Sequence, residues 1–198
     1  MSADAAMDAE SLARRYVEAG DVPAAAKALI EAFGPEVLGW LGAICRSTSD
    51  AEDVFSATCE SLLRALPTLH RDGSLRTWMY VVARNFAYNQ YRRDRRRNAV
   101  PLSDAPDLAA LVHSTTAAHR ATRNKDRLRA LREALEPEDR TLLVLRVDRE
   151  LPWRDIAEIL AGGADDPDQL TRDAARLRKR FERVKQQLRA HWDAAGRD

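Results

Sequence analysis

Residues 74–97 read SLRTWMYVVARNFAYNQYRRDRRR and decide the fold of this chain. Apolar side chains recur through this stretch every three or four residues, which predicts one long helix. We expect its buried face to hold Leu75, Trp78, Met79, Val82 and Phe86. Five arginines occupy six positions at its end. The stretch therefore predicts a helix that packs along one face and ends in concentrated positive charge.

The polar side chains of the same stretch favour contact with nucleic acid. On a helix, one contiguous side would hold Arg84, Asn85, Tyr88, Asn89, Arg92 and Arg96. Arginine and asparagine reach phosphates and base edges. Aromatic side chains can stack on unpaired bases, and the candidates here are Trp78, Tyr80, Tyr88 and Tyr91. Each aromatic could instead belong to the core, but clustered arginines repel one another and so favour an anionic partner.

The residues before this helix also read as helices. Their apolar spacing predicts helices over about 8–19, 23–33, 35–45 and 51–66. Gly20 would end the first, and Gly34 with Pro35 would interrupt the chain between the second and third, because proline lacks the N–H that a helix interior needs. Capping residues at 47–50 would start the fourth, and residues 67–73 would form a loop.

The residues after it change character. Residues 98–122 hold prolines, serines and threonines with little periodicity, which predicts a flexible linker with a short helix at 107–112. Helical patterns return over about 123–135, 136–147, 151–160 and 167–192. The last two, separated by Gly162 and Gly163, have the shape of a helix-turn-helix, whose second helix enters the major groove. A plain helical hairpin is the alternative. The expected fold is all-α, with two small helical domains.

The net charge is +1, but the charged residues are unevenly distributed along the chain. Residues 1–70 carry eleven acidic and five basic side chains, whereas residues 71–103 carry eight arginines and two aspartates. Segregated charge sets the potential over a surface. The acidic half can meet a basic protein, and the basic stretch can meet nucleic acid.

Several classes of protein lack support in this sequence. No window holds 18 consecutive apolar residues, so no membrane span is expected, and the acidic start of the chain lacks a signal pattern. Cys45 and Cys59 have no CxxC or histidine companions and suit a reducing cytoplasm. The four histidines are scattered, and phosphate-loop, hydrolase and zincin motifs are missing. We therefore expect no catalytic residues, no metal site and no cofactor.

Four carboxylates, Asp50, Glu52, Asp53 and Glu60, accompany the apolar stripe of the helix over 51–66. Acidic side chains are favourable at a helix N-terminus, which accounts for Glu52 and Asp53 without a function. The alternative is an acidic patch that binds protein.

In order along the chain, these segments resemble the extracytoplasmic-function sigma factors, the small alternative promoter-recognition subunits of bacterial RNA polymerase. Residues 50–60 look like the docking helix, and residues 74–97 look like the promoter-melting and minus-ten helix. Residues 135–160 look like the start of the minus-35 domain, and 177–188 like its recognition helix. The resemblance implies a region 2-like domain over 1–97, a linker over 98–122 that threads the polymerase cleft, and a region 4-like helix-turn-helix domain over 123–198.

The resemblance also implies residue roles. Docking on core polymerase would use Glu52, Asp53, Ser56 and Glu60. The minus-ten element, including a flipped base of the non-template strand, would be held by His70, Arg71, Ser74, Arg76, Trp78, Arg84, Asn85, Tyr88, Asn89, Arg92, Arg93 and Arg96. The minus-35 element would be contacted by Arg172, Arg176, Arg178, Lys179, Arg180 and Arg183.

The sequence departs from the family pattern in three places. Ser56 stands where the family usually has glutamine, and Asn89 where aspartate is common. The turn after Leu160 is about ten residues longer than usual, which predicts an extended recognition helix starting near Pro167.

The leading hypothesis is a sigma factor without enzymatic activity, whose partners are core RNA polymerase, promoter DNA in duplex and melted form, and an anti-sigma factor. A helix-turn-helix regulator that binds duplex DNA without polymerase is the alternative. A third hypothesis is an adaptor that binds only protein.

Overall fold

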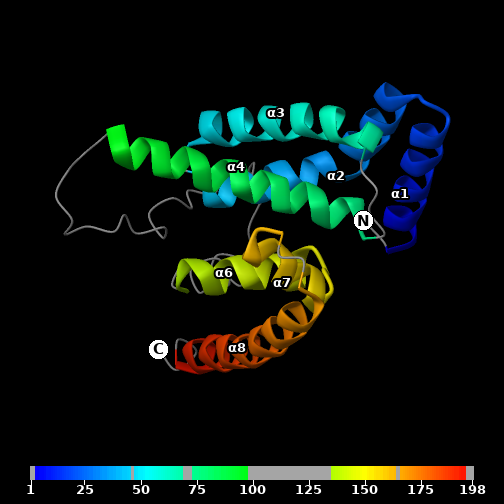
Figure 1. Ribbon diagram of the computed structural model, residues 1–198. Helices are drawn as coiled ribbons and strands as arrows, with labels where there is room; N and C mark the ends of the chain where they lie inside the picture. The colour runs from blue at the N-terminus through cyan, green and yellow to red at the C-terminus, as the bar shows by residue number, and fades with distance from the viewer. Residues whose placement is uncertain (1–2, 46, 69–72, 98–134, 164–165, 195–198) are drawn as a thin grey trace, which may run out of the picture. The chain divides into compact units, whose positions relative to one another are not determined.

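The computed structural model describes residues 3–45, 47–68, 73–97, 135–163 and 166–194. Regular structure within these ranges is helical throughout, which confirms the all-α expectation. Helices α1–α4 belong to one compact unit, and α6, η3, α8 and the first half of α7 belong to another (Figure 1). The predicted linker over 98–122, its short helix and the helix over 123–135 lie almost wholly outside the described residues, which resume at Leu135.

Four helices build the first unit: α1 (Ala3–Glu18), α2 (Val22–Ile44), α3 (Thr48–Ala65) and α4 (Leu75–Arg97), with a short 3₁₀ turn, η1 (Leu66–Thr68), after α3. In Figure 1, α3 and α4 lie side by side with α2 behind them, and α1 stands across one end. Gly20 ends the α1 segment with a φ of +77°, and the Asp21 side chain accepts a hydrogen bond from the Ala24 N–H at 3.0 Å to cap α2.

The predicted interruption at Gly34 and Pro35 is wrong, because helix α2 runs unbroken through both residues. Buried side chains continue at helical spacing across this point, from Leu29 and Phe33 to Val37. Burying them favours one continuous helix over the local preference of proline, whose missing N–H removes one backbone hydrogen bond. Gly34 serves packing: a Cβ there would lie 3.1 Å from Phe55 Cζ of α3.

Helix α3 begins as its capping residues predict. The Ser47 side chain accepts a hydrogen bond from the Asp50 N–H at 3.0 Å, and the helix starts at Thr48. Its buried stripe is made of Ala51, Val54, Thr58 and Leu62. The acidic residues of α3 lie on the side of the helix that faces away from this stripe.

Helix α4 covers nearly the whole range predicted for it, but its buried face is broader. Leu75 and Met79 are buried as expected, whereas Trp78, Val82 and Phe86 are half-buried. Tyr80 is fully buried and meets Trp40 of α2 edge to face, with ring centroids 5.3 Å apart. The suggestion that Tyr80 could stack on bases was therefore wrong, because its ring is part of the core.

The second unit contains α6 (Pro137–Leu143), a π-helical turn η3 (Val144–Asp148), the start of α7 (Trp153–Ala161) and α8 (Pro167–Ala194). Its core gathers Leu142, Leu145, Leu151, Ile156, Phe181 and Val184. Gly162 and Gly163 follow α7 with positive φ values of 76° and 93°, which confirms the predicted break. None of the helices in the described part of the chain is long and apolar enough to cross a membrane.

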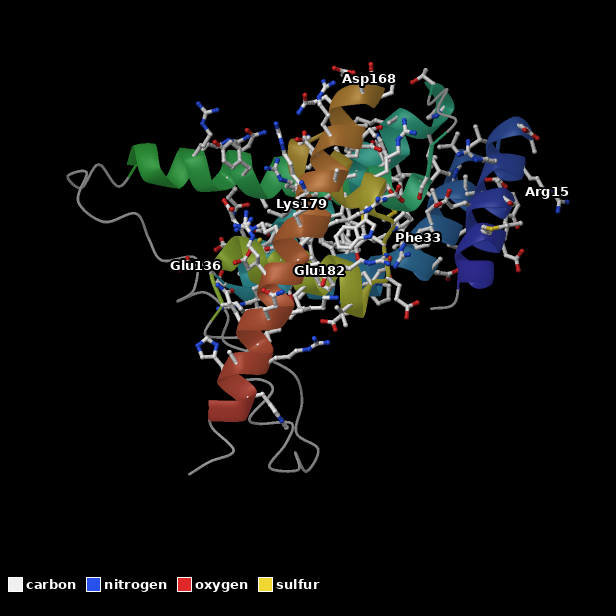
Figure 2. All side chains as sticks on the ribbon, turned by 90° about the horizontal axis from the view of Figure 1, so that it is seen from below. Arg15, Phe33, Glu136, Asp168, Lys179 and Glu182 are labelled. Carbon is white, nitrogen blue, oxygen red and sulfur yellow. The ribbon has the colours of Figure 1, made fainter. Side chains whose placement is uncertain are left out.

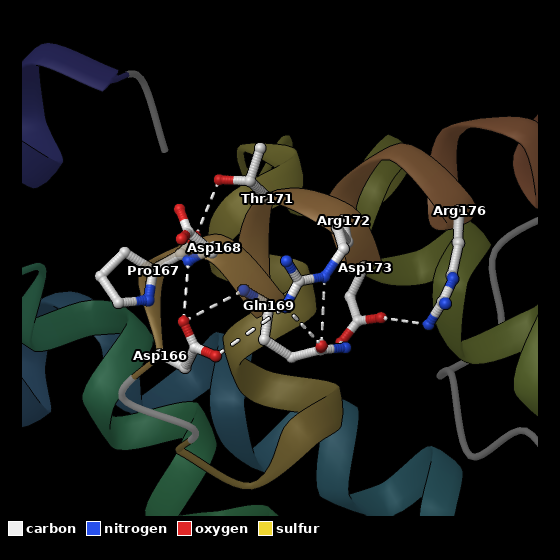
Figure 3. A network of polar contacts seen from close by, with 8 residues as sticks. All are labelled: Asp166, Pro167, Asp168, Gln169, Thr171, Arg172, Asp173 and Arg176. Carbon is white, nitrogen blue, oxygen red and sulfur yellow. Dashed lines mark hydrogen bonds and ion pairs between the residues drawn. The ribbon is translucent and has the colours of Figure 1, made fainter.

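Helix α8 starts where the sequence predicted, at Pro167. Asp166 Oδ1 accepts hydrogen bonds from the Asp168 N–H at 2.9 Å and the Gln169 N–H at 3.3 Å, and Pro167 is the first helical residue (Figure 3). The long helix expected from Pro167 is therefore present. Figure 2 shows its side chains from Asp168 near the start to Lys179 and Glu182 farther along.

Candidate nucleic-acid and protein interfaces

One side of α4 brings together several of the residues predicted to meet DNA. Asn89, Arg92 and Arg93 are exposed, and Tyr88 is 54% exposed. The Arg92 guanidinium lies 5.9 Å from the centre of the Tyr88 ring, a cation–π arrangement. By helical spacing, Trp78 and Asn85, both half-buried, lie on the same side as Tyr88. Arg84 is half-buried at its edge. This side offers an exposed aromatic ring among cations and amides.

Two predicted DNA contacts, Ser74 and Arg76, have internal partners instead. The Ser74 hydroxyl donates to Glu10 Oε1 at 2.7 Å and accepts from the Thr77 N–H at 3.1 Å. Arg76 donates two hydrogen bonds to Glu36 of α2, at 2.6 and 2.9 Å. Its side chain is 14% exposed. We therefore leave both residues out of the DNA-facing side.

Three other predicted contacts fall outside what is described. His70 and Arg71 belong to residues 69–72, and the side chain of Arg96 is likewise outside the described part. They remain predictions.

Helix α1 supplies functional candidates that the sequence pattern did not indicate. The Glu10 carboxylate accepts the N–H groups of Leu75 and Arg76 at 3.0 Å each, besides the Ser74 hydroxyl. Arg14 donates to the Gly73 carbonyl at 2.7 Å. Periodicity could not reveal these contacts, because they join residues about sixty positions apart.

The outer side of α3 holds the residues predicted to dock on polymerase. Glu52, Asp53, Ser56 and Glu60 are all exposed, and they occupy the side opposite the buried stripe. Leu63, 43% exposed, shares that side. Glu60 pairs with Arg64 at 2.7 Å, but both side chains are well exposed, and such pairs contribute little to stability. The surface is acidic with one apolar contact, which suits a basic protein partner.

A side-chain hydrogen bond joins the two helices that carry these surfaces. Gln90 Nε2 of α4 donates to Asp50 Oδ1 of α3 at 2.9 Å. Asp50 stands two positions before Glu52, and Gln90 stands between Asn89 and Arg92. The acidic side of α3 and the basic end of α4 are therefore held in a fixed relation.

On α8, helical spacing places four predicted residues on a ridge opposite the buried Leu170, Ala174, Phe181 and Val184. The ridge consists of Arg172, Arg176, Lys179 and Arg183, all exposed. Figure 3 shows its first half engaged locally: Arg172 meets Gln169 at 3.0 Å and Asp166 at 3.9 Å, and Arg176 meets Asp173 at 3.0 Å. Lys179 and Arg183 form no ion pair within the described residues.

The other two predicted minus-35 residues flank this ridge. Arg178 is exposed on one side. Arg180, on the other, donates to Glu138 at 2.6 Å and to Asp139 of α6 at 2.5 Å. Because both carboxylates hold its guanidinium against α6, Arg180 ties α8 to the domain core.

The chain is similar to known proteins in its first half and over most of its length. Residues 29–97 match the family model of sigma-70 region 2. The chain is also 27% identical over 133 residues to the RNA polymerase sigma factor YlaC of Bacillus subtilis (strain 168), which covers 67% of this chain and 77% of that protein. The chain therefore carries a sigma-70 region 2 and is similar to a bacterial RNA polymerase sigma factor, which supports its assignment as a sigma factor. This similarity supports a role in transcription initiation.

The region 2 match coincides with helices of the first unit. It begins within α2 at Leu29 and ends with α4 at Arg97, so it contains both the acidic side of α3 and the exposed side of α4. Helix α1, with Glu10 and Arg14, lies before the matched residues.

Cys45 and Cys59 are both free thiols. Burial, together with the nearby Asp50 charge, raises the pKa of the Cys45 thiol to about 11. Burial also raises the pKa of Cys59. Thiolate is the reactive form. Within the described residues, no group of three His, Cys, Asp or Glu side chains is arranged to hold a metal ion.

Proposed function

We propose that this chain is an extracytoplasmic-function sigma factor and that it binds core polymerase and promoter DNA through three surfaces. The outer side of α3, with Glu52, Asp53, Ser56 and Glu60, docks on core polymerase. The exposed side of α4 binds the opened minus-ten element, and the ridge of α8 binds the minus-35 duplex. The corresponding domains are residues 1–97 and 123–198, joined by a linker over 98–122 in the polymerase cleft. The polymerase supplies the catalysis, in the cytoplasm.

One observation carries the minus-ten assignment: Tyr88, Asn89, Arg92 and Arg93 are exposed together on α4. Unpaired bases stack on aromatic rings, at about 1–3 kcal/mol per base, and arginines hold the phosphates beside them. Duplex DNA hides its base faces, so an exposed ring among cations suits a strand that has been opened. His70 and Arg71 would extend this surface.

The minus-35 assignment is supported by the ridge on α8. A helix in the major groove contacts DNA with one side, and Arg172, Arg176, Lys179 and Arg183 lie on one side. Arg178 would reach a flanking phosphate. Arg180 is assigned to packing, because Glu138 and Asp139 engage it.

The decisive test is transcription in a purified system. Core polymerase with this chain should produce transcripts from specific starts on genomic promoter fragments, and core polymerase alone should not. Mapping the starts gives the two promoter elements. If the chain adds no initiation on any fragment, the proposal fails.

The α8 ridge also supports the second candidate, a regulator that binds duplex DNA without polymerase. The two candidates differ in one measurement. A regulator binds its operator tightly alone, whereas a sigma factor binds promoters poorly until core polymerase is present. An adaptor that binds only protein would show little salt dependence in its main affinity, while DNA binding weakens steeply with salt.

An anti-sigma factor is a further proposed partner. The acidic side of α3 would be its natural target, because covering that side blocks docking on polymerase. A purified inhibitor that abolishes core binding of the wild-type chain, but fails to bind a Glu52→Ala and Asp53→Ala variant, would support this; inhibition without loss of core binding would contradict it.

A further inference from the structure

The first turn of α4 is gripped by α1 from outside the matched region. Glu10 accepts from the Leu75 N–H, the Arg76 N–H and the Ser74 hydroxyl at 2.7–3.0 Å. Arg14, one turn farther along α1, donates to the Gly73 carbonyl at 2.7 Å. Two side chains of one helix thus hold the chain on both sides of Ser74, at the point where it enters α4.

The contacts of Glu10 and Arg14 with the start of α4 do more than cap a helix. The N–H groups of a first helical turn lack partners within the helix, and Ser74 already satisfies one of them through its bond to the Thr77 N–H. A local cap of this kind satisfies one of the four N–H groups at a helix start. Glu10 adds a negative charge at the positive end of the helix, and it does so from a different helix. Its particular effect is to fix where α4 begins relative to α1.

The position of that first turn matters far along α4. A helix rises about 1.5 Å per residue, so Tyr88 and Arg93 lie roughly 20–27 Å beyond the gripped turn. Because α4 is one continuous helix, a small rotation at its start also turns these two residues, which lie beyond Ala83, the last fully buried residue among those described on α4. Glu36 holds Arg76 in the same turn from α2, so the start of α4 is fixed from two helices.

We propose that Glu10 and Arg14 are positioning residues for capture of opened promoter DNA. They set the direction of α4 and the path of the chain that enters it at Gly73, and touch no DNA themselves. The inference rests on the proposed role of α4 at the minus-ten element. It adds α1 to the parts of the protein that determine how well the opened strand is held.

The test uses the full chain assembled with core polymerase. The probe is a fluorescent single-stranded oligonucleotide that carries the non-template minus-ten sequence of a mapped promoter. Glu10→Ala and Arg14→Ala should each weaken binding of the oligonucleotide by about tenfold, as expected for losing charge-assisted hydrogen bonds. Affinity for core polymerase should match that of Glu18→Ala, an exposed glutamate on the same helix, whereas the melting temperature should fall only modestly, because Ser74 still caps the Thr77 N–H.

Glu10→Gln provides the conservative variant. Its remaining carbonyl oxygen can still accept from Ser74 and Arg76, while its amide group opposes the Leu75 N–H. Oligonucleotide affinity should therefore lie between those of the wild type and Glu10→Ala. A purely structural role predicts instead that core affinity, oligonucleotide affinity and melting temperature fall together.

Three results would overturn the inference. The first is unchanged oligonucleotide affinity in both alanine variants. The second is a parallel fall of all three measurements. The third is a wild-type assembly that does not bind the oligonucleotide at all; this defeats the proposed function itself, whereas the first two defeat only the role of α1.

Discussion

Arg76 of α4 and Glu36 of α2 form a two-pronged ion pair that is almost entirely withdrawn from solvent, with side chains 14% and 11% exposed. Both guanidinium–carboxylate distances are short, at 2.6 and 2.9 Å. A buried charge is tolerated when it is paired and hydrogen-bonded. The pair therefore matters most when one partner is removed.

Replacing Glu36 with alanine should destabilise the first unit by about 3 kcal/mol, because a nearly buried guanidinium would lose both of its hydrogen bonds to this carboxylate. Urea unfolding followed by circular dichroism measures the change. Glu31→Ala is the control, since Glu31 is 67% exposed in a surface pair with Lys27. Equal stability of the two variants would contradict the prediction.

Replacing Arg92 and Arg93 together with alanine should impair promoter opening and leave the fold intact, because both side chains are exposed. Permanganate reactivity of unpaired thymines reports opening. The charge-matched control replaces Arg15 and Lys27, exposed cations on α1 and α2. A collapsed melting temperature with unchanged DNA contact would show that this side of α4 is wrongly assigned.

On α8, Lys179→Ala and Arg183→Ala should weaken binding of a minus-35 duplex more than Arg172→Ala does. Arg172 is already engaged by Gln169 and Asp166, whereas the other two cations are available for phosphates. Each lost phosphate contact should lower the salt slope of binding by roughly 0.9. Titrations at several salt concentrations give the slopes, and a larger effect at Arg172 would refute the ordering.

Cys45 should make stability depend on alkaline pH. Its folded pKa is about 11, above the ordinary 9.0, so the folded thiol keeps its proton where the unfolded thiol has lost it. The contribution is complete below pH 9 and falls as pH rises from 9 to about 11, by on the order of 2 kcal/mol in total.

Cys45→Ala lacks this titration, so its unfolding free energy should fall less steeply than that of the wild type between pH 9 and 10.5. Comparing the two slopes removes the contribution of tyrosines and lysines, which both proteins share. Parallel slopes would contradict the prediction.

The sequence predicted most helices because their signals are local. Ser47 and Asp166 cap the helices that follow them, and Gly162 breaks the chain through a backbone conformation that glycine adopts easily. Local signals failed where burial overrode them. Pro35 is tolerated within α2 because apolar side chains on both sides of it are buried.

The candidate surfaces were predictable only in part, because spacing tells which residues share a side but not which partners they meet. Tyr88 and Lys179 were placed on exposed sides as expected. Tyr80 contacts Trp40, Arg76 pairs with Glu36, and Arg180 pairs with the α6 carboxylates. The spacing of residues along the chain does not predict such partners. Glu10 was missed for the same reason: its contacts depend on how α1 crosses the start of α4.

The edge-to-face pairs in the two units have a spectroscopic consequence. Trp40 lies against Tyr80 in one unit, and Trp153 lies 5.4 Å from Phe181 in the other. The Trp40 indole N–H is buried and has no hydrogen-bond partner in the described structure, so its fluorescence should be strongly blue-shifted. Each unit thus carries its own intrinsic fluorophore, and variants that retain one tryptophan would report, without added label, which part of the protein responds first when it binds promoter DNA.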